Sequence, residues 1–332
     1  METHKIILKS RPAAEPVLDN FELVKESLPV INENELLLKA KYVSVDPYMR
    51  GRMNNVKTYV DPYEVGQAIN GDIVAEVEQS KSKDFNEGDL VVGNLPWQEY
   101  INASENSIKK IEKDDIPPSL YLSLFGMTGL TAYFGLLDIG KPKKKETVII
   151  TSAAGAVGSV AGQISKIKKC KVIGITGSDE KVDYLKTELD FDNAFNYKSS
   201  SNIRKEIKNC WQEGVDIFFD NVGGELSDSI MYLINNFARI IVCGQISQYN
   251  QSRLAMGPRM QMFLLTRRAL MQGFIVNDYM NKFDTALNEL KQWFKEGKLK
   301  YRETIIEGFE NLPEAFLGLF KGDNIGKLLV KV

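Results

Sequence analysis

A run of small residues marks a change from strand to helix near the middle of the chain. Thr151-Ser152-Ala153-Ala154-Gly155-Ala156-Val157-Gly158-Ser159 follows the β-branched run Thr147 to Ile150 and precedes a helical segment, Val160 to Ile167. Such a turn leaves the first N–H groups of the helix uncovered, and the helix dipole adds positive charge there. The stretch therefore predicts a turn that can hold a phosphate group.

This turn matches the dinucleotide fingerprint G-x-G-x-x-G in part, because Ala153 stands where the first glycine is expected. We expect Gly155 to form the tight turn. Ala156 and Gly158 would let a pyrophosphate approach the backbone, and Ser159 would add a hydroxyl donor. Gly/Ala clusters between a strand and a helix can also serve packing alone, so the motif by itself leaves both interpretations open.

Strands and helices alternate along this half of the chain. Helices are expected at Lys181 to Leu189 and at Glu225 to Asn235. Six strands are expected, which is the number that a doubly wound dinucleotide-binding sheet needs. They are Thr147 to Thr151, Lys171 to Thr176, Ala194 to Asn196, Val215 to Asp220, Ala238 to Gly244 and Met271 to Val276. The sequence therefore predicts an α/β Rossmann domain with a six-stranded parallel sheet.

The end of the second strand indicates which dinucleotide binds. An NAD-binding fold places an Asp or Glu about 20 residues after the glycines, where it contacts the ribose 2'-hydroxyl. Here the strand ends in Ile175-Thr176-Gly177-Ser178, without a carboxylate. Ser178 can cap the next helix, and Lys181 in its first turn opposes the helix dipole unless it meets a phosphate. NADP is therefore preferred, with Asp179 and Glu180 expected to face solvent.

Residues 1–120 show short strands and turn signals with little helical periodicity. Asn34 to Val45 and Gly71 to Glu78 are strand-like, and Asn86 to Asp89 turns the chain into Leu90 to Gly93. The last strand, within Gly322 to Val332, follows a completed parallel sheet, so we assign it to this β domain. The predicted division is 1–120 with 300–332 for a barrel-like β domain, and 121–299 for the dinucleotide domain.

One segment of the β domain is polar and irregular. Ser44 to Met53 is expected to be a surface loop that turns at Pro47 and Gly51. Phenol donors and cations gather in and after it, a lining that suits a carbonyl-bearing or acidic small molecule; they are Tyr48, Arg50, Arg52, Tyr59 and Tyr63.

Composition excludes several kinds of function. Lys and Arg number 42 against 44 Asp and Glu, so the formal charge of −2 favours neither nucleic acid nor an anionic membrane as partner. The N-terminus lacks a signal-peptide core, and no apolar run approaches the length of a membrane span. Three widely spaced cysteines, Cys170, Cys210 and Cys243, indicate a reducing compartment and packing roles. We expect a cytoplasmic protein.

The single histidine, His4, is expected at the frayed start of the chain. Without a C-x-x-C pair or further histidines, the sequence offers no zinc ligand set, so no metal is expected. The same count removes a Ser-His-Asp hydrolase and a histidine base, unless His4 folds back into a site.

Eight motifs occur in a fixed order along both halves of the chain. They are Val45-Asp46-Pro47-Tyr48-Met49-Arg50, Gly126 to Tyr133, Ala153 to Ser159, Gly177 to Lys181, Phe195-Asn196-Tyr197-Lys198, Asp220-Asn221-Val222-Gly223-Gly224, Cys243 to Asn250 and Asn324-Ile325-Gly326-Lys327. In this order they resemble the zinc-independent medium-chain dehydrogenase/reductases of the leukotriene hydroxydehydrogenase, prostaglandin reductase and alkenal double-bond reductase group. The resemblance implies a GroES-like β-barrel domain beside the Rossmann domain, and a homodimer formed by edge pairing near Gly273 to Val276.

The resemblance also implies NADPH-dependent reduction of the carbon–carbon double bond of an α,β-unsaturated aldehyde or ketone. Lys181 and Tyr197 would contact the 2'-phosphate, with Thr176 and Ser178 nearby. Gly155, Ala156, Val157 and Gly158 would lie against the pyrophosphate. The nicotinamide and its ribose would be flanked by Met127, Thr128, Asn221, Cys243, Gly244, Tyr249 and Asn324, and the substrate by Tyr48, Arg52, Tyr63 and Tyr249.

Hydride addition to an enone needs a hydrogen-bond donor at the carbonyl oxygen and a proton for the α-carbon. Many members of the family place a tyrosine where this chain has Thr266, and a threonine is a poorer acid. Tyr48 and Tyr249 are therefore the expected donors, with a ribose hydroxyl or water as alternatives. A quinone reductase and a non-enzymatic NADPH-binding protein are the competing functions.

Overall fold

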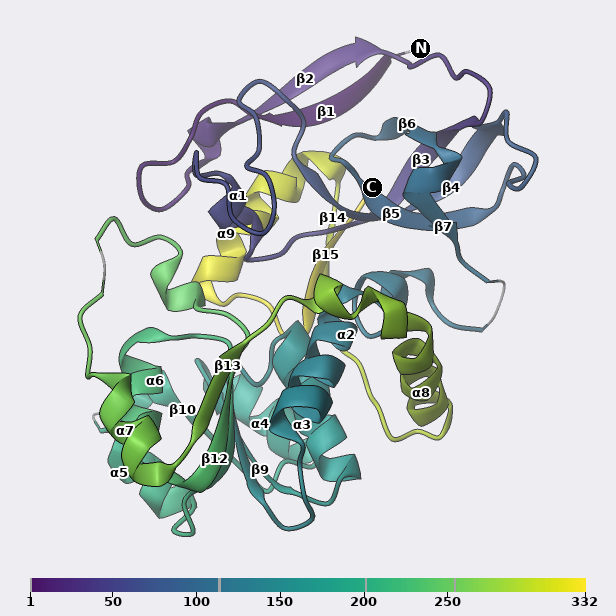
Figure 1. Cartoon of the computed structure of the whole chain (residues 1–332). Coiled ribbons are helices and arrows are strands. Elements are labelled where there is room, and N and C mark those ends of the chain that lie inside the picture. Colours follow the sequence, from purple (N-terminus) through teal and green to yellow (C-terminus); the bar gives the residue numbers. More distant parts are fainter. Residues whose placement is uncertain (1, 113–114, 201, 254) are drawn as a thin grey trace. The chain divides into compact units, whose positions relative to one another are not determined.

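The computed structural model describes residues 2–112, 115–200, 202–253 and 255–332. The chain divides into two units (Figure 1). One comprises Met1–Ser123, Glu303–Asn324 and Leu328–Val332, and the other comprises Leu124–Arg302 and Ile325–Lys327. The sequence placed these divisions at residues 120 and 300. The short segment Ile325–Lys327, which returns to the second unit, was not anticipated.

The second unit is built on a six-stranded sheet in which every neighbouring pair is parallel. Its order is β10-β9-β8-β11-β12-β13, so the winding direction reverses between β8 and β11. The bounds are β8 Thr147–Thr151, β9 Lys171–Thr176, β10 Asn193–Asn196, β11 Val215–Asp220, β12 Ile234–Val242 and β13 Leu270–Gly273. This is the predicted doubly wound Rossmann sheet, and the prediction is confirmed.

Helices cover both faces of this sheet, with α3 and α4 on one face and α5, α6 and α7 on the other (Figure 1). Alternating side chains of β11 meet the two layers, since Phe218 packs in a cluster with Ile230 of α6, whereas Phe219 lies by Gly135 at the start of a π-helical turn, Gly135–Gly140. The helices are α2 Met127–Phe134, α3 Ala156–Ile167, α4 Asp179–Thr187, α5 Ile203–Cys210, α6 Gly224–Met231, α7 Met260–Arg267 and α8 Phe283–Lys295.

Several predicted boundaries in this unit are wrong. The helix predicted to reach Asn235 ends at Met231, and β12 begins at Ile234, because Ile234 already pairs with Val215 of β11. The last strand ends at Gly273, and Val276 is instead a buried residue that begins a 3-10 helix. Exposed helix ends and irregular strands carry weak periodicity, which explains these errors.

Antiparallel strands form most of the first unit. β1 Glu2–Leu8 pairs with β2 Phe21–Ser27, and a larger sheet has the order β14-β15-β3-β4-β5-β7, with β6 paired to β3. The final strand pairs with β3, as the sequence predicted. The bounds are β3 Glu35–Ser44, β4 Asn70–Ser80, β5 Leu90–Pro96, β6 Tyr100–Ser104, β7 Ile108–Lys110, β14 Glu303–Glu307 and β15 Lys327–Lys331, with helices α1 Met49–Arg52 and α9 Leu312–Lys321.

Two expectations for this unit are wrong. Residues 44–53 do not form a plain surface loop, because they include helix α1, and Met49 and Met53 are fully buried in the core. The prediction failed because the two methionines supply apolar core contacts within a segment whose other residues are mostly polar. His4 is not frayed, since it lies in β1 and its ring nitrogen Nδ1 is 2.8 Å from the Glu99 carboxylate.

Within the described ranges, no helix combines the length and the apolar character that a bilayer span requires.

Candidate functional site

The predicted cofactor residues of the Rossmann unit follow the carboxyl ends of neighbouring strands. In a parallel sheet these ends meet at one edge, and ligands bind where the strand order reverses. The residues at this edge are Gly155 to Gly158 after β8, Ser178 and Lys181 after β9, Tyr197 after β10, Asn221 after β11, and Cys243 and Gly244 after β12, with Thr176 as the last residue of β9. The fold thus brings together residues that span about 90 positions of the chain.

The conformation of the turn between β8 and α3 differs from the prediction, which assigned the tight turn to Gly155. Ser152, with φ of 50°, carries the left-handed conformation, whereas Gly155 has φ of −83°. A Cβ atom on Gly158 would lie 2.4 Å from the carbonyl oxygen of Ser152, so this glycine lets the helix pack against the turn. Gly155 precedes α3 without a side-chain cap, which leaves the helix N-terminus open to an anion.

The corner formed by the ends of β9 and β10 is cationic. A Cβ atom on Gly177 would lie 3.4 Å from the Tyr197 ring and 3.6 Å from the Lys198 ammonium nitrogen. Asn196 fixes this corner, because its side chain accepts a bond from the Lys198 N–H at 3.0 Å and donates one to Asp179 at 2.9 Å. Sequence reasoning missed Lys198 as a site residue, although the motif containing it was recognised.

Ser178 caps α4, as predicted, by accepting the N–H of Lys181 at 3.4 Å. Thr176 is buried, while Lys181 is half-buried in the first turn of the helix. The corner therefore combines the first turn of α4, which includes Lys181, with the side chains of Tyr197 and Lys198. Such a group of donors suits a phosphate better than a neutral hydroxyl.

Asn221 is held at the end of β11 by the neighbouring strand. Its backbone N–H donates to the Thr151 hydroxyl at 2.9 Å, and its side-chain amide donates to the Thr151 carbonyl at 2.7 Å. The Asp220 carbonyl accepts the N–H groups of Cys243 at 2.9 Å and Gly244 at 3.1 Å. The ends of β8, β11 and β12 thereby form one rigid polar edge.

Tyr249 lies at the β12 end of this edge. A Cβ on Gly244 would be 3.4 Å from the Tyr249 hydroxyl oxygen and 3.3 Å from the Asn221 carbonyl oxygen, so glycine leaves room for both. The Tyr249 hydroxyl also accepts the Gln245 N–H at 3.4 Å. Burial and the nearby Asp220 raise the pKa of the Cys243 thiol to about 12, which makes it a neutral packing group.

Two further segments carry predicted cofactor residues, and one of them adjoins the phosphate-binding turn. Met127 and Thr128 begin α2, where a Cβ on Gly129 would lie 1.9 Å from the Leu124 carbonyl oxygen. Gly326, with φ of 69°, pairs with Gly155 in a parallel bridge and donates its N–H to the Ala154 carbonyl at 2.7 Å. The segment that follows Asn324 therefore reaches this turn at Gly326, two residues after Asn324.

The predicted substrate residues of the first unit form an aromatic and cationic group. The Arg52 guanidinium lies 4.0 Å from the centre of the Tyr63 ring. Tyr63 is buried, and its hydroxyl donates to the Asn70 carbonyl at 2.6 Å. Arg50 binds the Ala14 carbonyl at 2.6 Å, which is a structural contact. Tyr48 is half-buried, and burial together with Tyr63 raises its pKa well above the usual value.

Thr266 belongs to helix α7 of the second unit. It is exposed on α7, and its hydroxyl donates to the Met262 carbonyl one helical turn earlier, at 2.7 Å. The neighbouring Arg267 and Arg268 are exposed, as expected of surface cations. Threonine at this position thus satisfies its own helix.

No group of three or more His, Cys, Asp or Glu side chains in the described residues is arranged to hold a metal ion. The conserved-domain description "N-terminal domain of oxidoreductase" matches residues 4–111, and "Zinc-binding dehydrogenase" matches residues 156–292. The words "Zinc-binding" in the second description refer to a wider set of dehydrogenases, whereas this chain has one histidine and three cysteines.

Among similar proteins, "Putative NADP-dependent oxidoreductase YfmJ" of Bacillus subtilis is 54% identical, covering 99% of this chain and 97% of that protein. "Prostaglandin reductase 1" of Rattus norvegicus is 45% identical over 95% of each chain. "2-alkenal reductase (NADP(+)-dependent)" of Nicotiana tabacum is 40% identical, covering 99% of this chain and 97% of that protein.

A crystal structure of CurA from Vibrio vulnificus in complex with NADPH superposes with a TM-score of 0.94. It is 40% identical, and 99% of each chain is covered. Identities of 40% to 54% over nearly the full length of both chains show the family. The chain belongs to the zinc-independent medium-chain dehydrogenase/reductases.

Proposed function

We propose that this protein uses NADPH to reduce the carbon–carbon double bond of α,β-unsaturated aldehydes or ketones. The observation that carries the proposal is the single edge of the parallel sheet. There a cationic corner after β10 and β9, an uncapped helix N-terminus after β8 and the Asn221–Gly244–Tyr249 group after β11 and β12 follow one another across the sheet. This sequence of groups suits a dinucleotide phosphate from one end to the other, and the chain is similar over nearly its full length to relatives named as an NADP-dependent oxidoreductase and an NADP(+)-dependent 2-alkenal reductase.

The phosphate groups have fitting partners in this chain. Ala156, Val157 and Gly158 would hold the pyrophosphate with the backbone N–H groups of the first turn of α3. Gly155 would lie against it without a side chain, since its own N–H donates to the Ser152 carbonyl at 3.0 Å. Lys181, Tyr197 and Lys198 would hold the 2'-phosphate, while Thr176 and Ser178 line the same corner. A ribose 2'-hydroxyl could not balance these cations, so NADPH is preferred over NADH.

The nicotinamide half would then meet the second half of the sheet. Asn221, Cys243, Gly244 and Tyr249 belong to this half. Met127 and Thr128 would join them from the start of α2, and Asn324 from the segment that precedes Gly326. When bound, NADPH supplies the hydride for the β-carbon of the substrate. The protein must provide a donor for the carbonyl oxygen and exclude competing reactions.

Two phenols are the proposed donors. Burial keeps the pKa of Tyr48 high, so its hydroxyl retains its proton at neutral pH and can donate a hydrogen bond to the carbonyl oxygen. Tyr249 presents its hydroxyl beside Gly244. Arg52 would attract the developing negative charge, whereas the Tyr63 hydroxyl is engaged by Asn70 and would act by supporting Arg52.

The test follows loss of NADPH absorbance with purified protein and a panel of alkenals, alkenones and quinones. We expect turnover with the first two classes. Consumption with quinones alone would establish a quinone reductase, and NADPH binding without any turnover would indicate a non-enzymatic NADPH-binding protein. Tyr48→Phe and Tyr249→Phe should identify the donor, with Tyr232→Phe, an exposed phenol just before the amino end of β12, as the matched control.

A homodimer and a cytoplasmic location complete the proposal. Strand β13 is the outer strand of the parallel sheet, and Leu270 on it is 49% exposed, which supports edge pairing between two copies. Light scattering coupled to size exclusion would give the mass in solution. Three free cysteines support a reducing compartment, which fractionation of cells would test.

A further inference from the structure

Asp220 is the last residue of β11, and its carboxylate is buried with 6% exposure. Oδ1 accepts hydrogen bonds from the Thr151 hydroxyl and from the N–H groups of Val222 and Gly223, each at 3.0 Å. Oδ2 accepts the Ser227 hydroxyl at 2.6 Å. Among the residues that the structure describes, no lysine, arginine or histidine forms an ion pair with it. Neutral donors alone stabilise this charge.

The charge of Asp220 reaches beyond its hydrogen-bond partners. Burial first, and Asp220 second, raise the pKa values of Asp228 and Cys243. Because the carboxylate is buried, its field is screened less than that of a surface acid. A site beside the end of β11 is therefore electrostatically negative, although the adjoining corner at β9 and β10 is cationic.

The position of Asp220 in the sheet indicates which part of a bound dinucleotide its charge would act on. A doubly wound fold consists of two mononucleotide-binding halves, and β11 opens the second of them. This step rests on the proposed function, in which the first half takes the adenosine 2'-phosphate. The second half, where Asp220 and Asn221 lie, is then left for the nicotinamide.

The two redox forms of nicotinamide differ in charge. A dihydronicotinamide ring is neutral, and loss of a hydride with its electron pair leaves a pyridinium cation. The β-carbon of the substrate receives that hydride, and its α-carbon receives a proton from a phenol or water. A fixed negative charge near the ring favours the cationic form, and so favours departure of the hydride.

We propose that Asp220 is an electrostatic positioning residue, which orients Asn221 through Thr151 and stabilises oxidised over reduced nicotinamide by its buried charge. Its hydrogen bonds fix the strand ends that would face the ring. Its charge lowers the free energy of the bound NADP+ state relative to the bound NADPH state. The two roles can be distinguished experimentally. Misplaced strand ends should weaken the binding of both NADP+ and NADPH, whereas loss of the charge alone should weaken only the binding of NADP+.

Asp220→Asn is the main variant, since the Asn oxygen can still accept the bonds made to Oδ1 and its amide can donate to Ser227. The measurement is the pair of dissociation constants for NADP+ and NADPH, by calorimetry without substrate. We expect the ratio of the NADP+ constant to the NADPH constant to rise about tenfold, as a unit charge at moderate distance in a protein requires.

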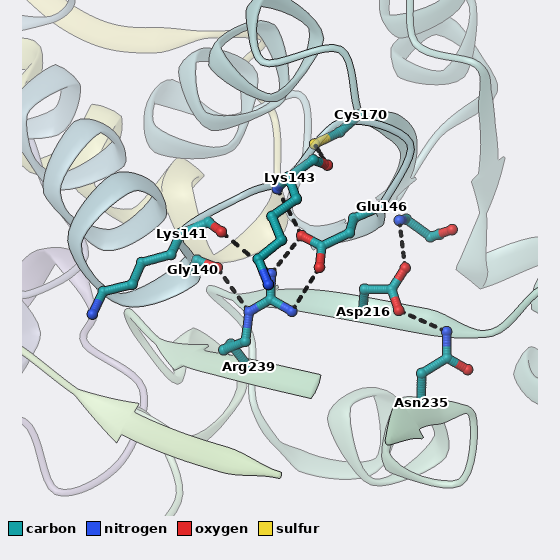
Figure 2. A network of polar contacts seen from close by, with 9 residues as sticks. Gly140, Lys141, Lys143, Glu146, Cys170, Asp216, Asn235 and Arg239 are labelled. Carbon is teal, nitrogen blue, oxygen red and sulfur yellow. Dashed lines mark hydrogen bonds and ion pairs between the residues drawn. The ribbon is translucent and has the colours of Figure 1, made fainter. Parts of the chain in front are cut away.

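Asp216→Asn is the matched control, because Asp216 lies at the opposite end of the same strand. It accepts the Thr147 N–H and an Asn235 amide hydrogen, each at 2.8 Å (Figure 2). This control should leave the ratio unchanged. Thr151→Val keeps the charge of Asp220 but removes the Thr151 hydroxyl that links Asp220 to Asn221, so it should weaken the binding of NADP+ and NADPH equally.

An unchanged ratio in Asp220→Asn, or an equal loss of both forms, would overturn the electrostatic role. If that variant does not fold, the wild-type ratio decides, since a clear preference for NADPH over NADP+ contradicts the inference. A wild-type protein that binds neither form would instead contradict the proposed function.

Discussion

The ion pair between Arg239 and Glu146 should be the largest single polar contribution to the stability of the Rossmann unit. Arg239 donates Nη1 to Glu146 Oε1 at 3.0 Å, Nη2 to the other carboxylate oxygen, and Nε to the Gly140 carbonyl at 2.8 Å (Figure 2). The two side chains are 17% and 18% exposed. The pair thus connects β12 to the residue before β8 and to the end of the π-helical turn.

Arg239→Met removes these three contacts and a fourth, in which Nη2 donates to the Lys141 carbonyl at 3.5 Å, while keeping an aliphatic stem (Figure 2). Breaking a fully buried pair costs about 3–5 kcal/mol, and partial exposure here reduces the expected cost to about 2–3 kcal/mol. For a unit of this size that corresponds to a fall in Tm of roughly 5–10 °C. The double variant Arg239→Met/Glu146→Met should recover part of this loss, because it leaves no unpaired charge.

Thermal and urea unfolding of the four proteins in the cycle would measure the coupling energy. We expect a coupling of about 2 kcal/mol. The NADPH dissociation constant should stay unchanged in the same variants, because the pair lies at the amino ends of the strands, away from the proposed cofactor edge. A single-variant loss below about 0.5 kcal/mol would refute the reasoning, since that is typical of an exposed pair.

Three further predictions follow from the contacts. Lys181→Ala and Lys198→Ala should each weaken NADPH binding about 10- to 100-fold and leave NADH nearly unchanged, measured by calorimetry; equal losses for both cofactors would show that neither lysine contacts the 2'-phosphate. Tyr184→Phe should stabilise the protein by about 1 kcal/mol in urea unfolding at neutral pH, because the Tyr184 hydroxyl is buried without a hydrogen-bond partner in the described structure. Burial raises the pKa of Tyr184 to about 12, above the value of about 10 for a free phenol, so the unfolded chain loses this proton first and the free energy of unfolding should fall as the pH rises from about 10 to 12; in Tyr184→Phe this alkaline loss should disappear, and an unchanged alkaline profile would contradict the assignment. Gly158→Ala should destabilise by about 1–3 kcal/mol in thermal unfolding, since its Cβ would lie 2.4 Å from a backbone oxygen; a neutral effect would mean that the turn can move.

The strands of the parallel sheet were the most predictable part of the fold. Thr147–Thr151, Lys171–Thr176 and Val215–Asp220 have the predicted bounds, because a strand buried on both faces needs a continuous apolar run. Met271 to Val276 failed because an exposed outer strand carries a weaker pattern. Met49 and Met53 were missed because their burial depends on contacts with strands far along the chain.

The candidate site was predictable in its residue types and less so in its geometry. The missing acid after β9 pointed to NADP from the sequence alone, since charge type is a local property. Lys198 and Asp220 gained their importance only when β10 and β11 were placed beside β9 and β8. Tyr63 shows the opposite case, because a phenol that looked available donates to the Asn70 carbonyl.

The sequence by itself determined the alternation of strands and helices, the phosphate-binding turn and the preference for a 2'-phosphate. Each of these depends on residues that are close together in the chain. The tertiary structure decided that Ser152 carries the strained turn, that Lys198 joins the cationic corner, and that Asp220 is a buried acid without a described ion-pair partner. The physical reason is that hydrogen bonds and burial depend on neighbours such as Thr151 and Asp220, which only folding brings to 3.0 Å.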